Sequence, residues 1–213
     1  MSFKYYSSLL TVLICFGLPP RAFGQYIRKE SVGGKTFAII YSEELPKTAR
    51  WEPGIKMMRN GATIRHQVSK GNGNNLSVND KIPLRFIVAP TDIGPVSWIA
   101  ATGVTDGDNN LNTDFTTQSN TGCRNYGTTT EGANRKWRVP TQRELQLMWL
   151  FREVIPQVYT GAPMEDTTQS KRYWAATEQD ATNAWYFDFK KNYPECSWQL
   201  KTSTGYVRCV SDY

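Results

Sequence analysis

Histidine is almost absent from this chain of 213 residues, and other signatures of catalysis are missing as well. The one histidine is His66, so a Ser-His-Asp or Cys-His arrangement would have to recruit it. No G-x-S-x-G sequence, which would place a serine nucleophile on a sharp turn, occurs anywhere in the chain. Carboxylates are present but in no arrangement specific for glycoside hydrolysis. The sequence therefore predicts a protein that is not an enzyme.

Long apolar runs are lacking too, apart from one near the start of the chain. This run, Leu9–Leu18, is shorter than the roughly 20 residues that span a bilayer. Together with Lys4 before it and a small-x-small site after it, the run predicts a signal peptide over residues 1–24. The mature chain then begins at Gln25 and has no transmembrane segment. The alternatives are an uncleaved membrane anchor and lipidation at Cys15, although the residue before that cysteine is larger than a lipobox prefers.

Concentrated charge of one sign is also missing. The formal net charge is +6 at pH 7, and removal of the signal peptide takes two basic residues with it. The remaining basic residues are scattered singly or in pairs, which is typical of a solvated surface and not of a phosphate-binding stripe. Nucleic acid is therefore not predicted as a partner. We expect an exported protein, located outside the cell, on its outer surface or in the periplasm.

The first part of the mature chain, residues 25–95, predicts a β-rich segment. KTFAIIY (Lys35–Tyr41) and KIPLRFIVA (Lys81–Ala89) have the composition of strands and are bounded by turn-forming residues. Between them, the polar sequence of residues 70–80 predicts a loop. This segment is either a small domain of its own or an extension that packs on the remaining chain, residues 96–213.

Four spaced segments in the second half of the chain carry most of the information about its fold. WRVPTQREL predicts a helix that begins after Thr141 and runs to about Glu153, with Glu144 completing a capping box. RYWAATE, NAWYFDF and GYVRCV predict strands, because they are rich in aromatic and β-branched residues. One helix followed by strands indicates an α+β fold. The four segments are Trp137–Leu145, Arg172–Glu178, Asn183–Phe189 and Gly205–Val210.

Two further stretches complete this half of the chain. Residues 96–103 predict either a strand or a short helix, and the polar stretch Val104–Thr130 predicts a surface loop. Within NAWYFDF, Trp185, Phe187 and Phe189 alternate with more polar residues. This period of two predicts a half-buried strand whose aromatic face packs on the helix.

In their order and their amino-acid sequences, the four segments resemble those of the Fibrobacter succinogenes major paralogous domain and of the related C-terminal domain of Legionella collagen-like proteins. The resemblance covers about Trp98–Asp212. It implies a C-type-lectin-like fold for residues 96–213, with short strands around one capped helix, in an exported surface or fimbrial protein without an established general enzymatic activity. The shared helix motif comprises Trp137, Arg138, Pro140, Thr141 and Glu144. Within it, Glu144 is expected to cap the helix and Arg138 to form a structural salt bridge or carbonyl contacts.

The mature chain holds three cysteines, Cys123, Cys196 and Cys209, and an exported protein can keep disulfides. The resemblance implies a bridge between Cys123 and Cys209, because cysteines recur at these two places in the family. A bridge between Cys196 and Cys209 is the alternative, since spacing alone does not give connectivity. The partner of Cys196 is left undetermined in the first case.

An acidic and amide-rich stretch places an oxygen-bearing side chain at every second position. Calcium prefers six to eight oxygen ligands, and such a loop can wrap several of them around one ion. The EF-hand glycine and glutamate are missing, and the triplets by which C-type lectins hold sugar through calcium are absent as well. The other interpretation is a cluster of Asn/Asp turns, in which case no cofactor is needed. The residues are Asp106, Asp108, Asn110, Asn112 and Asp114.

Aromatic residues near the C-terminus provide the remaining candidates for ligand binding. Tyr193 and Trp198 lie in the polar sequence NYPECSWQ, which predicts a loop with exposed rings. Exposed rings of this kind stack on sugars or anchor a protein partner.

Three functional hypotheses follow. The first is adhesion, with a glycan or a surface protein as the ligand of the lectin-like loops. The alternative is a structural or tip subunit of a fimbria-like assembly that pairs through KTFAIIY by strand addition. A second alternative is an enzyme on the fold of formylglycine-generating enzymes, because Arg138, Pro140, Thr141 and Glu144 are similar to their R-x-P-T-x-x-E segment. Cys196 and Cys209 do not reproduce the copper-binding cysteine pair of those enzymes.

Overall fold

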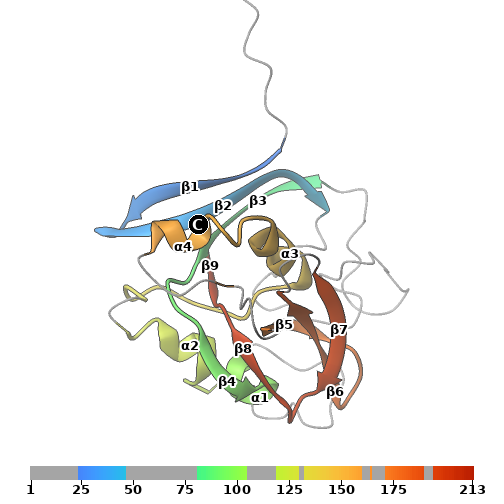
Figure 1. Cartoon of the computed structure of the whole chain (residues 1–213). Coiled ribbons are helices and arrows are strands. Elements are labelled where there is room, and N and C mark those ends of the chain that lie inside the picture. The colour runs from blue at the N-terminus through green and yellow to red at the C-terminus, as the bar shows by residue number, and fades with distance from the viewer. Residues whose placement is uncertain are drawn as a thin grey trace, which may run out of the picture.

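The structure is a computed structural model that describes residues 24–46, 81–104, 119–129, 132–159, 164, 171–189 and 194–213 (Figure 1). The described residues form two β-sheets with short helices beside them. The predicted α+β class and the β-rich N-terminal segment are therefore confirmed. None of the helices in these ranges is long and apolar enough to cross a membrane. The predicted signal peptide lies almost entirely outside the described residues.

The first sheet is built mainly from the N-terminal segment. Its strand order is β1-β2-β3-β9, and all its pairs are antiparallel. A tight turn at Gly33 and Gly34 joins β1 to β2, and both glycines have the positive φ that such a hairpin requires. The strands are β1 (Gln25–Val32), β2 (Lys35–Pro46), β3 (Lys81–Val88) and β9 (Val210–Asp212).

Strands β2 and β3 confirm the two strands predicted from KTFAIIY and KIPLRFIVA. Strand β1 was not predicted, because its sequence contains few apolar residues and three consecutive charged ones. Its presence corrects the strand-addition hypothesis. β2 lies between β1 and β3, so both of its edges are already paired within the chain. Most of KTFAIIY, from Ala38 to Tyr41, is therefore paired on both sides and has no edge to offer to a neighbouring subunit.

The second sheet contains five strands from the second half of the chain. Their order is β4-β8-β5-β6-β7, and β5 and β8 pair in parallel while the other neighbours are antiparallel. The strands are β4 (Ile93–Ser97), β5 (Arg172–Glu178), β6 (Asn183–Asp188), β7 (Glu195–Leu200) and β8 (Thr204–Val207).

Two of the strand predictions need correction. GYVRCV is not one strand, because β8 ends at Val207 and the chain passes through Arg208 and Cys209 into β9 of the other sheet. NAWYFDF is not half-buried, because Tyr186 and Asp188 are as well buried as Phe187. The reason is its position: β6 lies inside the sheet between β5 and β7, and both of its faces are largely covered.

Four short helices accompany the sheets in the described residues. They are α1 (Trp98–Thr102), α2 (Gly122–Tyr126), α3 (Gln142–Leu150) and α4 (Ile155–Val158). Residues 96–103 thus contain both the end of β4 and a helix. The stretch predicted as a surface loop, Val104–Thr130, contains α2, whose Cys123 and Tyr126 are buried. The predicted helix is α3, which ends three residues earlier than expected.

The two sheets share one core. Its cluster of buried apolar residues runs from Phe37 in β2 to Val210 in β9 and includes Trp98 and Leu145 of the helices. Helix α3 contacts β5 and β6, whereas α4 contacts β2. These helices lie between the upper and lower sheets in Figure 1. Packing therefore continues across the sequence boundary predicted between residues 95 and 96.

A disulfide holds the segment between β8 and β9, where the chain passes from one sheet to the other. Cys123 of α2 is bonded to Cys209, with their Cα atoms 5.5 Å apart. This is the pairing implied by the resemblance, and it overturns the alternative bridge between Cys196 and Cys209. Cys196 lies in β7, where the side-chain amide of Gln142 donates to its Sγ atom at 3.4 Å.

Loss of this disulfide should destabilise the whole fold. The bridged cysteines are 86 positions apart, and closing a loop of that length contributes about 4 kcal/mol in the chain-entropy model. We expect Cys123→Ala with Cys209→Ala to lower the free energy of unfolding by about 3–5 kcal/mol in denaturant titrations without reductant. Cys196→Ala is the control and should change it by less than about 1 kcal/mol. Equal effects of the two changes would contradict this assignment.

Candidate ligand-binding face on strand β7

The predicted site residues fall into three groups. The helix-motif residues and the two bridged cysteines are buried or nearly so, and they hold the sheets together. Trp198 lies on strand β7 with its side chain at the surface. Tyr193 and the five residues of the predicted calcium loop lie outside the described residues.

The helix motif centres on a buried ion pair. The Arg138 guanidinium donates two hydrogen bonds to the Glu144 carboxylate, at 2.8 and 2.7 Å, and a third to Asp212 Oδ1 at 2.8 Å. The Glu144 side chain is fully buried, and it also accepts from the backbone N–H of Thr141 in the predicted capping box. Burial by itself would lower the pKa of Arg138, but the two carboxylates raise it above its usual range. The expected structural roles of Glu144 and Arg138 are thus seen in full.

Backbone contacts make the same motif a strap between the two sheets. Arg138 and Val210 exchange two backbone hydrogen bonds of 2.9 Å, which attaches the motif to β9 of the first sheet. Two residues later, the Pro140 carbonyl accepts from Ala176 N at 2.8 Å, which attaches it to β5 of the second sheet. Trp137 is buried beside Phe37, and its indole N–H donates to a backbone carbonyl. The motif therefore has an architectural function.

A second polar cluster holds the chain where it leaves β8. The Asp92 carboxylate accepts from Arg208 and from the Tyr173 hydroxyl and forms an ion pair with Lys171. Arg208 also donates to the carbonyls of Ala89 and Pro90, so its guanidinium ties the end of β8 to the segment after β3. Burial raises the pKa of Tyr173 well above its usual value, which keeps the phenol protonated. The cluster thus joins the end of β8 to β5 and to the segment before β4.

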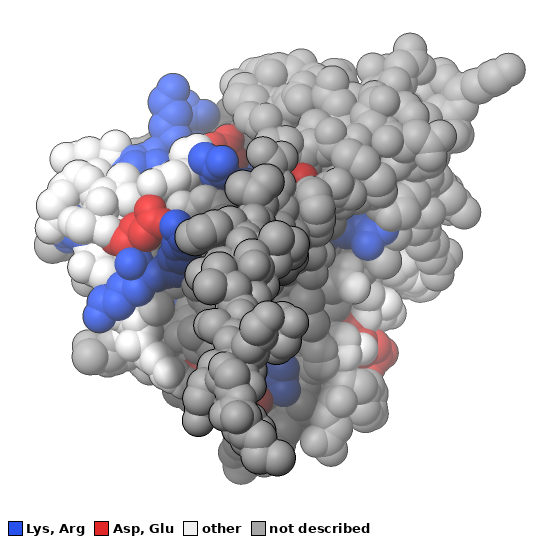
Figure 2. All heavy atoms as spheres, turned by 90° about the horizontal axis from the view of Figure 1, so that it is seen from above, with Lys and Arg blue, Asp and Glu red and all other residues white. Residues whose placement is uncertain are grey.

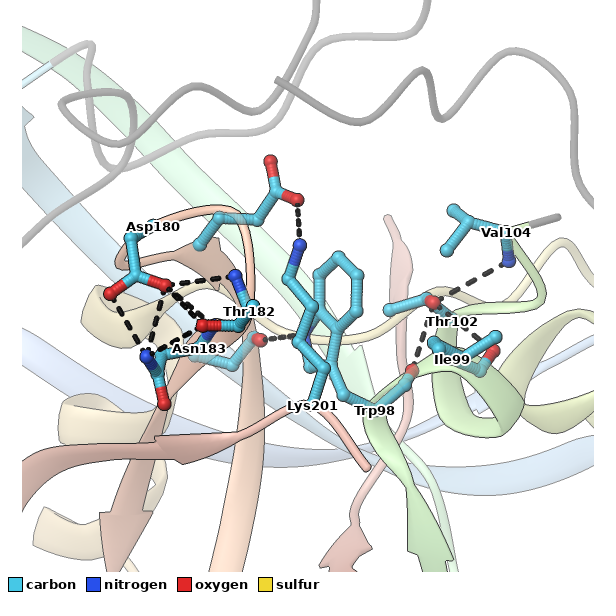
Figure 3. Close-up of polar contacts among 10 residues, drawn as sticks. Trp98, Ile99, Thr102, Val104, Asp180, Thr182, Asn183 and Lys201 are labelled. Carbon is cyan, nitrogen blue, oxygen red and sulfur yellow. Dashed lines mark hydrogen bonds and ion pairs between the residues drawn. The ribbon is translucent and has the colours of Figure 1, made fainter. Parts of the chain in front are cut away.

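A third cluster lies under the turn that follows β7. Lys201 and Glu178 form an ion pair of 2.6 Å, and neither side chain is exposed (Figure 3). The Lys201 ammonium also lies 4.9 Å from the ring centre of Trp98, close enough for a cation–π interaction. Backbone bonds from Lys201 to Thr182 and from Trp98 to Lys201 fix the same turn. The pair thus joins β5, the end of β7 and helix α1.

The neighbouring turn between β5 and β6 is fixed by Asp180. Its carboxylate accepts from the backbone N–H groups of Thr182 and Asn183 and from both of their side chains (Figure 3). Desolvation would raise the pKa of Asp180, but the hydrogen bonds from Asn183 and Thr182 lower it overall. This is an Asx-type turn with a structural function.

An aromatic and charged cluster covers part of the first sheet. The rings of Tyr26 and Tyr41 are stacked at 4.9 Å, and Arg28 and Arg85 lie over them. Glu30 accepts from the hydroxyl of Tyr41, which lowers its pKa, and from the C-terminal tyrosine as well. Figure 2 shows this side of the molecule, where the described Lys and Arg side chains are interspersed with Asp and Glu.

The exposed face of β7 differs from these clusters because two of its large apolar side chains are about half exposed. Trp198 and Leu200 are 51% and 53% exposed. Trp198 lies directly opposite Trp185 of β6, so both rings stand on the same face of the sheet. Phe187 and Cys196 continue this face toward α3, which covers it. The result is an apolar surface patch beside α3 that includes the rings of Trp185 and Trp198.

Sequence reasoning found Trp198 but misjudged its setting. NYPECSWQ was predicted as a loop, whereas residues from Glu195 onward form strand β7. The signal for a strand was present, because Cys196, Trp198 and Leu200 alternate with Ser197 and Gln199. The polar residues before the strand obscured this period. Leu200 was missed as a surface residue for the same reason.

No group of three or more His, Cys, Asp or Glu side chains within the described ranges is arranged to hold a metal ion. The polar clusters above instead form hydrogen bonds and ion pairs inside the chain. The β7 face is therefore the candidate site that the described residues offer.

Comparison with protein families agrees with the motifs. The model of the Lcl C-terminal domain matches residues 92–211, which is more than half of the chain. The chain belongs to this family. The predicted resemblance to the C-terminal domain of Legionella collagen-like proteins is thereby confirmed, and it indicates a domain of the surface-protein type. No curated protein matches the sequence.

The matched region contains the strap, the second sheet and most of β9, so the β7 face belongs to the Lcl C-terminal domain itself. Strands β1, β2 and β3 precede the match and are an addition to it. The last strand of the matched region nevertheless completes the sheet that these strands form.

Removing one partner of the buried Glu178–Lys201 pair should be costly. Glu178→Gln leaves the Lys201 ammonium buried without its counter-ion, and we expect the free energy of unfolding to fall by about 3–5 kcal/mol in denaturant titrations. The same change in the exposed pair, Glu153→Gln, should cost less than about 1 kcal/mol. The double change Glu178→Leu with Lys201→Met should recover most of the loss. A small effect of Glu178→Gln would show that the pair is dispensable.

Proposed function

We propose that this chain is an exported, non-enzymatic surface protein that binds a glycan or a protein through the β7 face. Membership in the Lcl C-terminal domain family supports a surface location. The observation that carries the binding proposal is the half-exposed indole of Trp198 beside Leu200 and Trp185. This face combines apolar area with ring surfaces on a sheet that the neighbouring strands hold in place.

The chemistry of the face suits ligands with flat apolar surfaces. An exposed indole stacks against the apolar side of a sugar ring, and tryptophan is also enriched among the residues that dominate protein interfaces. Trp185 and Trp198 come from adjacent strands, so their positions are set by the sheet and little side-chain freedom is lost on binding. Leu200, two residues after Trp198 on the same face of the strand, extends the apolar area.

The absence of an enzymatic role is supported by how the described charged groups are used. Glu144, Glu178 and Asp92 each accept from a cationic side chain, and the contacts of each connect separate elements of the fold. The formylglycine-generating-enzyme alternative also loses its cysteine pair, because Cys209 is bonded to Cys123. Residues of the R-x-P-T-x-x-E segment form the structural contacts of the strap, in which Arg138 pairs with Glu144 and Pro140 bonds to β5.

The lectin-like arrangement of residues 96–213 is part of the proposal. It is supported by the capped helix α3, which packs against β5 and β6 of the second sheet. A calcium ion held by residues 106–114 remains an alternative means of ligand binding. It makes a separate prediction, because chelation would then abolish binding.

The proposal is tested by screening the mature chain on glycan and matrix-protein arrays, followed by titration of any ligand found. We expect Trp198→Ala to weaken binding at least about tenfold, as removal of a central aromatic contact usually does. Tyr213→Ala removes an aromatic side chain of similar exposure directly after the last strand of the other sheet and should leave the affinity unchanged.

Two results would contradict the β7 face as the ligand site. One is an array without binding above background, and the other is equal affinity of the Trp198→Ala variant and the parent chain. Loss of binding with EDTA but not with Trp198→Ala would instead favour the calcium loop. Binding to glycans alone or to proteins alone would identify the ligand class.

A further inference from the structure

Strand β1 forms one outer edge of the first sheet and is the longest edge strand in the described part of the chain. It has eight residues, whereas the other edge strands, β4, β7 and β9, have five, six and three. All eight pair with β2 without a bulge, and β1 is the outermost strand of the upper sheet in Figure 1. An edge strand exposes a row of unpaired N–H and C=O groups. A long and regular edge therefore offers a template for a further strand.

A tyrosine hydroxyl on the inner side of β2 shows which backbone groups of β1 face outward. Ala38 N of β2 donates to the Tyr159 hydroxyl, which donates in turn to Val88 O of β3, the residue opposite Ala38. The N–H of Ala38 therefore faces β3 and not β1. Its pair with Lys29 of β1 is a non-hydrogen-bonded one, so the N–H and C=O groups of Lys29 point away from β2.

The alternation of the ladder extends this result along β1. Hydrogen-bonded and non-hydrogen-bonded pairs alternate, so Ile27 and Ser31 also have outward backbone groups. The two-residue turn after β1 gives the same phase, because the residues that flank such a turn, Val32 and Lys35, form a hydrogen-bonded pair. Among the described residues, none bonds to the outward groups of Ile27, Lys29 or Ser31. This edge is thus open within the described ranges.

The side chains on one face of β1 form a self-complementary series. Tyr26, Arg28, Glu30 and Val32 alternate along the strand and share this face. In a second copy that runs antiparallel about Lys29, the same four residues follow in reverse order. Arg28 then lies opposite Glu30 twice, and Tyr26 lies opposite Val32 twice. Opposite charges and apolar side chains directly across a ladder both stabilise strand pairing.

We propose that β1 is a self-association edge at which two copies of this chain pair antiparallel about Lys29. The outward backbone groups of Ile27 bond with those of Ser31 in the second copy, and the reverse pair forms by symmetry. The two four-stranded sheets become one continuous sheet. The Arg28–Glu30 pairs occupy non-hydrogen-bonded positions, where side chains across a ladder are closest. This interface is twofold and closed, so association stops at the dimer.

The two charged groups are held in place before a second copy arrives. The Glu30 carboxylate accepts from the hydroxyls of Tyr41 and Tyr213, one on each oxygen and both at 2.8 Å. A carboxylate has about four acceptor positions, so it keeps room for a guanidinium. The guanidinium carbon of Arg28 lies 5.1 Å from the ring centre of Tyr26, and the Arg28 side chain is exposed. Little side-chain freedom is therefore lost when the pair forms.

Charge also selects this register over its neighbours. Antiparallel pairing about Arg28 or about Glu30 would satisfy the outward backbone groups as well, but it would place like charges opposite each other at the axis. A parallel pair would set each charge beside its own copy. Like charges directly opposite are destabilising. In the proposed register only Lys29 meets its own copy, on the other face of the strand, and this contact keeps the dimer weak.

The proposed edge is independent of the proposed ligand site. Strand β1 precedes the match to the Lcl C-terminal domain, whereas β7 lies within it. The dimer thus assigns a role to the strands that are added before the domain. Self-association is measured without ligand, so its failure and the failure of ligand binding are distinguished.

The test is sedimentation velocity of the mature chain up to about 1 mM at about 0.15 M salt, since a small interface is expected to be weak. We expect reversible, concentration-dependent dimerisation. Arg28→Glu and Glu30→Arg each turn both opposite-charge pairs into like-charge pairs, and each should raise the dissociation constant at least about tenfold. An equimolar mixture of these two variants should dimerise again, because the charges of one complement those of the other.

Two further variants make the result specific. Arg85→Glu is the matched control, since Arg85 is also exposed and stacks over Tyr41 but belongs to β3, inside the sheet. It changes the net charge as Arg28→Glu does and should leave the dissociation constant unchanged. Lys29→Gln removes the like-charge contact at the axis and should lower the dissociation constant.

Amide hydrogen exchange of the unaltered chain provides a measurement that needs no variant. The N–H groups of Ile27, Lys29 and Ser31 should exchange more slowly at high than at low protein concentration. Those of Arg28 and Glu30 are already bonded to β2 and should not change. A chain that stays monomeric, a homodimer that survives Arg28→Glu, a mixture of the two charge variants that does not associate, or protection confined to another edge would each overturn the proposal.

Discussion

The buried pair between Arg138 and Glu144 is the interaction on which the arrangement of the two sheets depends. Glu144 caps helix α3 and holds Arg138, whose backbone is bonded to β9. Pro140, two residues further, is bonded to β5 in the other sheet. One short segment therefore fixes the helix and both sheets at once. Since a carboxylate with no exposure is very unfavourable without a partner, each of these contacts depends on the others.

This constraint separates structure from function within the chain. The residues of the helix motif, such as Trp137 and Arg138, are engaged in joining the layers of the Lcl C-terminal domain. The disulfide from Cys123 to Cys209 and the junction at Asp92 reinforce the same passage between sheets. The binding face that we propose on β7 lies outside this set of contacts.

The sequence predicted local features well and long-range ones poorly. The capping box at Thr141 and the strand RYWAATE depend on neighbouring residues, so their patterns were readable. The break at Arg208 depends on Asp92, more than a hundred positions earlier, and no local pattern reports it. In the same way, the burial of Asp188 follows from the central place of β6 in its sheet. The exposed Trp198 was found because its sequence neighbours are polar, but its strand was not.

We infer that the helix motif acts as a structural strap, and amide hydrogen exchange of an Arg138→Gln variant tests this role most directly. We expect faster exchange at both Val210 and Ala176, the amides that the strap holds in different sheets, while the N–H of Gln199 in β7 keeps its protection. Arg152→Gln, at the end of α3, is the control and should leave all three unchanged. Unaltered exchange at Val210 and Ala176 in the Arg138→Gln variant would contradict the claim.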